Sequence, residues 1–219
     1  MTKDPLYRWV YFLGGLSEPL RIQAEEVQAI QANHYQVGAT NSVQDVPVVL
    51  LPKASWVLRV ETAQPLSTEQ RLSLRGAAAC ELIGVTQHLH YASREQRQEL
   101  AAISAPELPA AEDSLAVLIP IRKSTAWWSL AHSERLAHFS HGSGHVPIGS
   151  KFAASIFRRL YHSRYLENVT GYDFLTYFEF PESRTSEFQQ LLKELRDTSG
   201  NPEWSYVEAE SEIWMRKKS

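Results

Sequence analysis

Two kinds of hydrophobic periodicity alternate along the second half of the chain, and their order limits the fold more than any other feature of the sequence. Short apolar or alternating runs of strand length occur at residues 115–121, 172–180 and 204–214. Apolar residues at helical spacing fill the intervals between them, at residues 127–139, 150–161 and 187–195. The order is strand, two helices, strand, helix, strand, and it predicts an α+β fold.

This order of elements matches a ferredoxin-like unit, which we place at residues 111–219. The Ala- and Pro-rich stretch at residues 105–113 comes at its start and is the best candidate linker in the chain. We therefore expect residues 1–110 to form a second, reduced half of the same kind.

The N-terminal half carries fewer signals. Its expected elements are strands at residues 7–13 and twice within residues 47–61, and helices at residues 67–82 and 93–103. Ser67 followed three residues later by Gln70 is a capping-box pattern, which predicts the start of the first helix. Gly76 is a weak point within that helix.

The composition limits the class of partner. With 219 residues, of which 43% are hydrophobic and 21% charged, the chain has ordinary globular composition. A net charge of −3 gives no basic surface for nucleic acid or for a membrane, so a small molecule is the expected partner. Cys80 is the single cysteine, which excludes an internal disulfide and a site built from several thiolates. Because the sequence has no apolar run of signal-peptide or membrane-spanning length, we expect a cytoplasmic protein.

The most specific motif of the chain lies at residues 118–162. Within it, Trp127 follows Lys123 by four residues, His145 follows Lys123 by 22, and Arg158 follows His145 by 13. Further segments of the same motif follow, DFLTYFE and then PEWSYVEAE, which contains Glu203.

This pattern, from IPIRKSTAWW through RRLYH to PEWSYVEAE, resembles the haem pocket of the chlorite dismutase family. The resemblance covers roughly residues 115–215. It implies an α+β fold in which two ferredoxin-like halves form an antiparallel β-barrel flanked by helices, known as the dimeric α+β barrel. The region near residues 61–84 resembles an insertion in the N-terminal half, and the chain is most similar to the short, dimeric lineage.

The resemblance also implies a cofactor, one haem b per chain. His145 would be the proximal ligand of the haem iron, at a junction between a loop and a helix. Glu203 would accept a hydrogen bond from the other ring nitrogen of His145, with Glu208 and Glu210 as rivals for that place. Lys123 would lie near this glutamate and a haem propionate and keep both carboxylates ionised.

Arg158 would face the haem from the distal side as the catalytic residue, because a guanidinium remains cationic and can hold an anion by several hydrogen bonds. Arg159 must point elsewhere, on the helix expected at residues 150–161. Apart from Lys123 and His145, the residues expected to line the haem are Trp127, Ile119, Leu175 and Phe178. Trp128 is expected in the core or in a subunit interface.

The implied activity is haem-dependent conversion of chlorite to chloride and dioxygen, in a homodimer with no nucleic-acid or membrane partner. Three alternatives remain open. The first is a haem peroxidase, or a decarboxylase acting on coproporphyrin, on the same fold. The second is a non-haem metal site, since His138, His141 and His145 are spaced for one helical face with Glu134 one turn earlier. The third is a module that binds haem or another small ligand without turnover.

Overall fold

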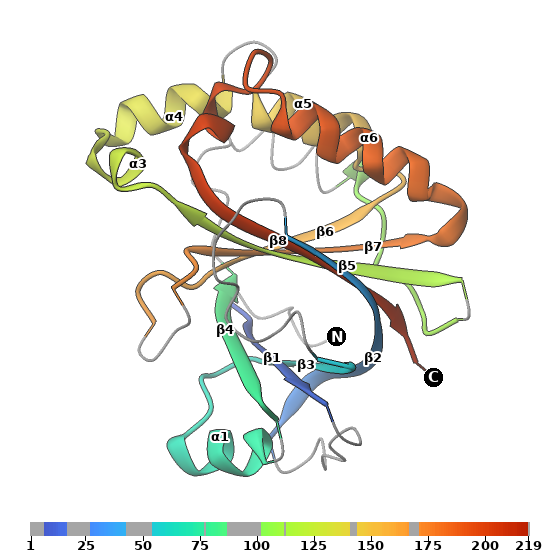
Figure 1. Cartoon of the computed structure of the whole chain (residues 1–219). Coiled ribbons are helices and arrows are strands. Elements are labelled where there is room, and N and C mark those ends of the chain that lie inside the picture. Colours follow the sequence, from blue (N-terminus) through green and yellow to red (C-terminus); the bar gives the residue numbers. More distant parts are fainter. Residues whose placement is uncertain are drawn as a thin grey trace.

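Among the described residues, eight antiparallel strands close into one barrel (Figure 1), in the order β1-β3-β2-β8-β5-β7-β6-β4. The computed structural model describes residues 7–16, 27–42, 54–76, 78–86, 102–111, 113–140, 144–166 and 171–218. The strands are β1 Trp9–Gly15, β2 Ala29–Ser42, β3 Trp56–Thr62, β4 Cys80–Thr86, β5 Ser114–Lys123, β6 Phe157–His162, β7 Phe174–Pro181 and β8 Val207–Lys217. Strands β1–β4 and β5–β8 each form one half of the barrel, and the halves meet where β2 pairs with β8 and β4 pairs with β6. The predicted α+β barrel of two ferredoxin-like halves is confirmed.

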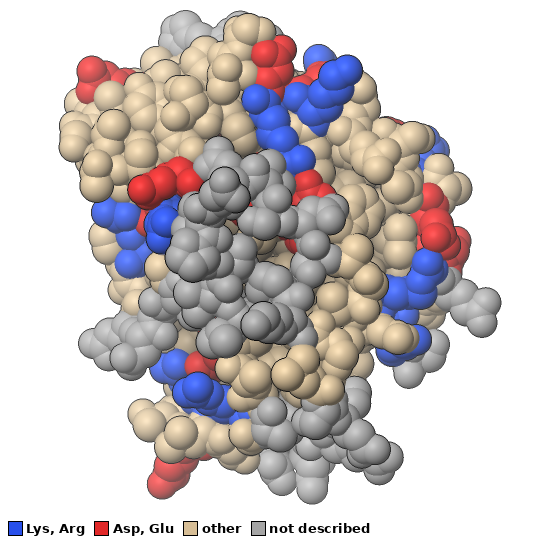
Figure 2. All heavy atoms as spheres, viewed as in Figure 1, with Lys and Arg blue, Asp and Glu red and all other residues tan. Residues whose placement is uncertain are grey.

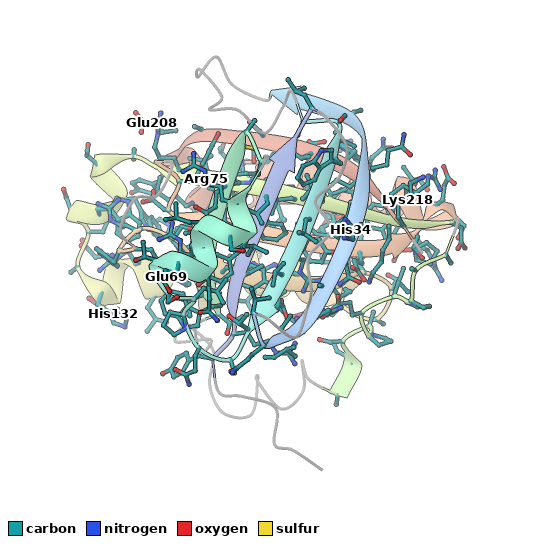
Figure 3. The ribbon with its side chains drawn as sticks, turned by 90° about the horizontal axis from the view of Figure 1, so that it is seen from below. His34, Glu69, Arg75, His132, Glu208 and Lys218 are labelled. Carbon is teal, nitrogen blue, oxygen red and sulfur yellow. The ribbon has the colours of Figure 1, made fainter. Side chains whose placement is uncertain are left out.

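Helices cover the barrel on two sides. They are α1 Thr68–Arg75, α3 Thr125–Ser129, α4 His132–Ser140, α5 His145–Phe152 and α6 Thr185–Arg196, with short 3-10 helices η2 Glu182–Arg184 and η3 Pro202–Tyr206. Figure 1 shows α3, α4, α5 and α6 above the strands of the C-terminal half, and α1 below those of the N-terminal half. In Figure 3, seen from below, α1 with Glu69 and Arg75 lies across those N-terminal strands.

The strands of the C-terminal half separate two cores. Because side chains alternate across a strand, one set faces the helices and the next faces the barrel interior. The helix-side core includes Val117, Ile119 and Phe178 from the sheet and Phe188, Leu191 and Leu192 from α6. The interior core includes Val10, Phe12, Tyr35, Tyr161, Leu175 and Tyr177. The site described below lies on the helix side.

In the N-terminal half, the strands expected at residues 7–13 and in the second part of 47–61 are confirmed as β1 and β3. The capping box is also confirmed, with Ser67 accepting from the Gln70 backbone and the Gln70 side chain accepting from the Ser67 backbone. The helix to residue 82 is wrong. It ends at Gly76, whose φ of 37° suits glycine, and β4 begins at Cys80. Residues 47–53 and 93–101 lie outside the described residues.

In the C-terminal half, β5, β7 and α6 confirm the expected strands and the last helix. The helix expected at residues 127–139 is two helices, α3 and α4, separated where Leu130 takes an extended ψ of 142°. The helix expected at residues 150–161 is wrong beyond Phe152, because residues 157–162 form β6 and pair with β7 along their whole length. The strand expected from residue 204 begins at Val207, after η3.

The candidate linker, residues 105–113, is held to the barrel by hydrogen bonds to buried side chains. Glu107 accepts a hydrogen bond from Arg59 of β3 at 2.5 Å. The next residue, Leu108, donates its backbone N–H to Glu179 of β7 at 2.7 Å and accepts from Lys217 of β8 at 2.7 Å. The stretch thus contacts buried charges from both halves. The division at residue 110 and the insertion near residues 61–84 remain predictions. The residues of that insertion supply α1 and most of β4.

Candidate functional site

The site begins with two side chains that face each other across the space between α5 and β6. His145 is the first residue of α5, and Gly144 caps the helix. Arg158 comes from β6, on the helix side of the sheet, since its register partner Phe178 belongs to the helix-side core. Its Nη2 lies 3.1 Å from His145 Nε2. The structure therefore brings together the histidine and the arginine that the sequence motif spaces 13 residues apart.

Glu203 holds the other ring nitrogen of His145. This glutamate lies in η3 and is 3% exposed, and its Oε2 is 2.9 Å from His145 Nδ1. Its Oε1 accepts from Lys123 Nζ at 2.5 Å, and Lys123 also donates to the Glu203 backbone carbonyl at 3.2 Å. Lys123, Glu203 and His145 thus form a continuous buried chain of hydrogen bonds.

The two rival glutamates are directed elsewhere. Glu208 has a side chain 54% exposed and pairs with Arg122 at 3.3 Å, and Figure 3 shows it at the outer edge of the molecule. Glu210 is buried but accepts from Arg196 at 2.7 Å. Of these three carboxylates, Glu203 is the one that contacts His145.

Within this chain of hydrogen bonds, Glu203 carries a fixed negative charge. Burial raises the pKa of the Glu203 carboxyl, but the charges and hydrogen bonds of Lys123 and His145 outweigh that effect and hold its pKa far below the ordinary value. Lys123 is itself 5% exposed, and its ammonium lies 4.8 Å from the Trp127 ring centroid and 5.6 Å from that of Trp204. These rings and the carboxylate replace the water that the ammonium loses.

The contacts select one tautomer of His145. A carboxylate can only accept a hydrogen bond, so Nδ1 carries the proton and donates to Glu203. A guanidinium can only donate, so Nε2 presents its lone pair to Arg158. This is the tautomer in which Nε2 can bind a metal while Nδ1–H is held by a carboxylate.

Arg158 lies deep in the protein and yet has accessible surface. Its side chain is exposed, whereas burial of the guanidinium lowers its pKa from the ordinary value, opposed by the attraction of Glu203. The guanidinium lies beside His145 Nε2. A guanidinium remains cationic under such a shift, so Arg158 offers a positive charge and several donors there.

The other predicted lining residues divide between two faces. Ile119 and Phe178 belong to the helix-side core, and Phe178 is the partner of Arg158 in the sheet register. Trp127 is 1% exposed and packs against Tyr206, with ring centroids 5.4 Å apart. Leu175 is wrongly placed in the prediction, because strand alternation puts it in the interior core, opposite Tyr161 in the register.

Two residues that the sequence reasoning missed support the site. Asp173 accepts from the Lys123 backbone N–H at 2.7 Å, which fixes the end of β5, and from Arg164 at 2.7 Å. Tyr206 packs against both Trp127 and His138. The signal for Tyr206 is its place in the motif segment that holds Glu203, and the signal for Asp173 is that it opens the motif segment DFLTYFE.

The structure does not support the non-haem metal site as the sequence spacing suggested it. His138 lies in α4 and His145 begins α5, so the two do not share one helical face. His141 lies outside the described residues. Within the part of the chain that the structure describes, no cluster of three or more His, Cys, Asp or Glu side chains could hold a metal ion.

A haem group fits the donors of this site. His145 offers Nε2 as an axial ligand, and Glu203 anchors the opposite nitrogen. Ile119 and Phe178 supply apolar surface on the sheet beside Arg158. Arg158 Nη2 lies within hydrogen-bond distance of the same Nε2, at 3.1 Å, so the positive group of the site stands beside the atom that would bind the iron.

Charge and hydropathy add two observations. Figure 2 shows acidic and basic side chains interspersed on the face it presents, without a large area of one sign among the described residues. No helix in the described ranges is long and apolar enough to cross a membrane.

Comparisons with known proteins identify the family. A curated chlorite dismutase from Ideonella dechloratans is 32% identical over 100 residues, which are 45% of this chain and 33% of that protein, so the chain spans a third of that relative's length. The dimeric chlorite dismutase of Nitrobacter winogradskyi has a similar structure, with a TM-score of 0.69 and 28% identity over 94% of this chain and 99% of that one. A variant of the chlorite dismutase from Candidatus Nitrospira defluvii shares the fold, with a TM-score of 0.69 at 20% identity over 99% of this chain and 93% of that one. The family model described as chlorite dismutase matches residues 22–212, and the chain therefore belongs to the chlorite dismutase family.

Proposed function

We propose that this protein is a haem b-dependent chlorite dismutase, which converts chlorite to chloride and dioxygen. The observation that carries the proposal is the opposed pair of His145, anchored by Glu203 and Lys123, and Arg158. The reaction balances without another reactant, since one chlorite anion contains the one chlorine and two oxygens of its products. When bound, haem iron would supply the redox chemistry that breaks the chlorine–oxygen bonds.

Glu203 and Lys123 determine how strongly the imidazole of His145 donates electrons. Nε2 is the atom that would bind the metal, and Nδ1–H donates to Glu203. A carboxylate that accepts a hydrogen bond from Nδ1–H moves the imidazole toward imidazolate and makes it a stronger electron donor. Lys123 keeps the carboxylate charged and fixed in place.

Arg158 binds the substrate. Its guanidinium is the positive group that faces His145 Nε2, and it lies next to the apolar surface of Phe178. Charge-assisted hydrogen bonds would hold the chlorite anion and then keep the chlorine–oxygen fragment in place until dioxygen forms.

Two finer points belong to the same proposal. A homodimer is supported by the Nitrobacter winogradskyi protein, which is described as dimeric and of which this chain covers 99%. The cytoplasmic location expected from the sequence is in keeping with a single cysteine, which is buried and free.

An oxygen electrode tests the function. The purified protein is loaded with haem b, its absorbance spectrum is recorded, and chlorite is added while dissolved oxygen is followed. The proposal predicts a Soret band and a burst of oxygen with chloride as the other product. A haem protein that releases no oxygen from chlorite, but oxidises a peroxidase dye or decarboxylates coproporphyrin, would instead support the other enzymes of this fold. Haem binding without any of these activities would support a binding module.

A further inference from the structure

Strand β6 carries two adjacent arginines that leave it on opposite sides. Arg158 points to the helix side, where it meets His145. Arg159, the next residue, enters the barrel, where its Nη1 donates to both carboxylate oxygens of Glu61, at 3.0 and 2.9 Å. Alternation along a strand couples the two directions, so a force that fixes Arg159 also fixes the orientation of Arg158.

Glu61 is the centre of a buried cluster of charges. It lies in β3 and is 0% exposed. Besides Arg159, its oxygens accept from Arg59 at 2.6 Å, from Arg8 at 2.9 Å and from the Tyr161 hydroxyl. Two of these partners, Arg159 and Tyr161, belong to β6.

These contacts cross the barrel rather than follow the sheet. In the strand order, β4 and β1 lie between β6 and β3, so Glu61 reaches β6 through the interior. Backbone pairing with β7 runs the whole length of β6, and the described pairs with β4 lie at Tyr161 and His162. Glu61 therefore adds a side-chain anchor directly beside Arg158.

The anchor stays charged at working pH. Burial raises the pKa of Glu61, but the nearby charges of Arg59 and Arg159 and the hydrogen bonds of Tyr161 and Arg8 lower it to about 2. A buried carboxylate with several cationic partners is costly to break from one side only, because the partners are then left unpaired.

We propose that Glu61 is a positioning residue for Arg158. By holding Arg159 and Tyr161 from inside the barrel, it sets the direction in which Arg158 leaves β6 on the helix side. The inference rests on the proposed function, in which Arg158 binds the substrate anion.

The first experiment needs no haem. Hydrogen exchange is followed in the wild-type chain and in Glu61→Gln, which keeps the shape but removes the charge. We expect amides of β6 to exchange about tenfold faster in the variant, while those of α6 are unchanged. Arg159→Gln serves as a second variant, because it removes one contact to β6 and leaves Arg8 and Arg59 on Glu61. Glu182→Gln, at an exposed carboxylate paired with Arg216, is the matched control.

The second experiment tests the effect on Arg158. Azide, a small anion that binds ferric haem, is titrated into the haem-loaded wild type, Glu61→Gln, Arg158→Ala and the double variant, with absorbance as the readout. We expect each single variant to bind azide about tenfold more weakly. The double variant should bind no more weakly than Arg158→Ala, because Glu61 acts through Arg158.

The outcomes separate the two claims. Unchanged exchange in β6, or losses of azide affinity that add up in the double variant, would overturn the positioning role while the proposed function stands. If Arg158→Ala itself leaves azide binding unchanged, the anion-binding role of Arg158 falls, and the positioning role falls with it.

Discussion

At the scale of single residues, the site depends on how one carboxylate is shared. Glu203 uses one oxygen for Lys123 and the other for His145, and both of its partners are fixed by their own elements, β5 and α5. The shared carboxylate determines which nitrogen of His145 carries the proton. It also explains why a lysine is buried at the end of β5, since the ammonium is needed to keep Glu203 charged.

Replacing Glu203 by Gln should weaken haem retention by about 10- to 100-fold, the usual cost of removing a carboxylate behind a histidine ligand. The neutral amide oxygen is a weaker acceptor for Nδ1–H than a carboxylate, and Lys123 loses its charge partner. Haem transfer to an excess of apomyoglobin measures the loss rate. Glu208→Gln, at the exposed rival, is the control. Equal loss rates in wild type and Glu203→Gln would contradict the role.

Replacing Arg158 by Ala should leave haem binding intact but reduce the number of turnovers before inactivation, by about tenfold or more. The reason is that the chlorine–oxygen fragment escapes when the guanidinium no longer holds it. Total oxygen released per haem, measured with an oxygen electrode, reports this number. An unchanged total would count against Arg158 as the catalytic residue.

The residues of the site could largely be predicted from sequence, but not the face on which every one lies. The spacing of Lys123, His145 and Arg158 identified side chains that the structure does bring together. The prediction that Leu175 lines the haem was wrong because a shift of one residue along a strand exchanges its two faces. Apolar residues lie on both faces of β7, so the sequence does not show which face meets the helices.

At the scale of elements, the main error was a helix in place of a strand. Residues 150–161 have apolar residues at helical spacing, but only the part up to Phe152 is helical. The segment FRRLYH pairs with β7 instead, since Phe157 and Tyr161 fill the barrel interior. Tertiary pairing outweighs local periodicity here, and the periodicity of a segment does not show which strand of the chain it will pair with. The amphipathic helix α6 and the aromatic strand β7 were predicted correctly.

Helix α1 lies far from the site and provides a test at this scale. Ser67→Ala removes the side chain that caps its first turn, which should lower the free energy of unfolding by about 1 kcal/mol. Urea denaturation measures that change. Oxygen release per haem should be unaffected below the unfolding transition. A large loss of activity in the folded variant would mean that α1 takes part in the site.

At the scale of the whole molecule, a cluster of buried charges joins the two halves of the barrel. Glu61 and Arg59 come from the N-terminal half, Arg159 and Glu179 from the C-terminal half, and Glu107 from the stretch between them. The sequence gives no sign of this cluster, because its members are ordinary surface residue types that only the closed barrel brings together.

This cluster should make stability depend on pH. The pKa of Glu61 falls from 4.5 to about 2 on folding, so its contribution is complete above pH 4.5 and is lost as the pH falls toward 2. The size of that contribution is about 3 kcal/mol. Urea unfolding of wild type and Glu61→Gln between pH 6 and pH 3, a range chosen to span the unfolded-state pKa, should show a free-energy difference that shrinks as the pH falls. A difference independent of pH would show that Glu61 does not gain its charge stabilisation on folding.

We propose that His145 and Arg158 face one haem from opposite sides. A crystal structure of the haem-loaded protein is the sharpest test. His145 Nε2 should bind the iron, Glu203 should remain on Nδ1, and Arg158 should lie on the other side of the haem. Iron bound by a different residue, or both side chains on the same face, would contradict it.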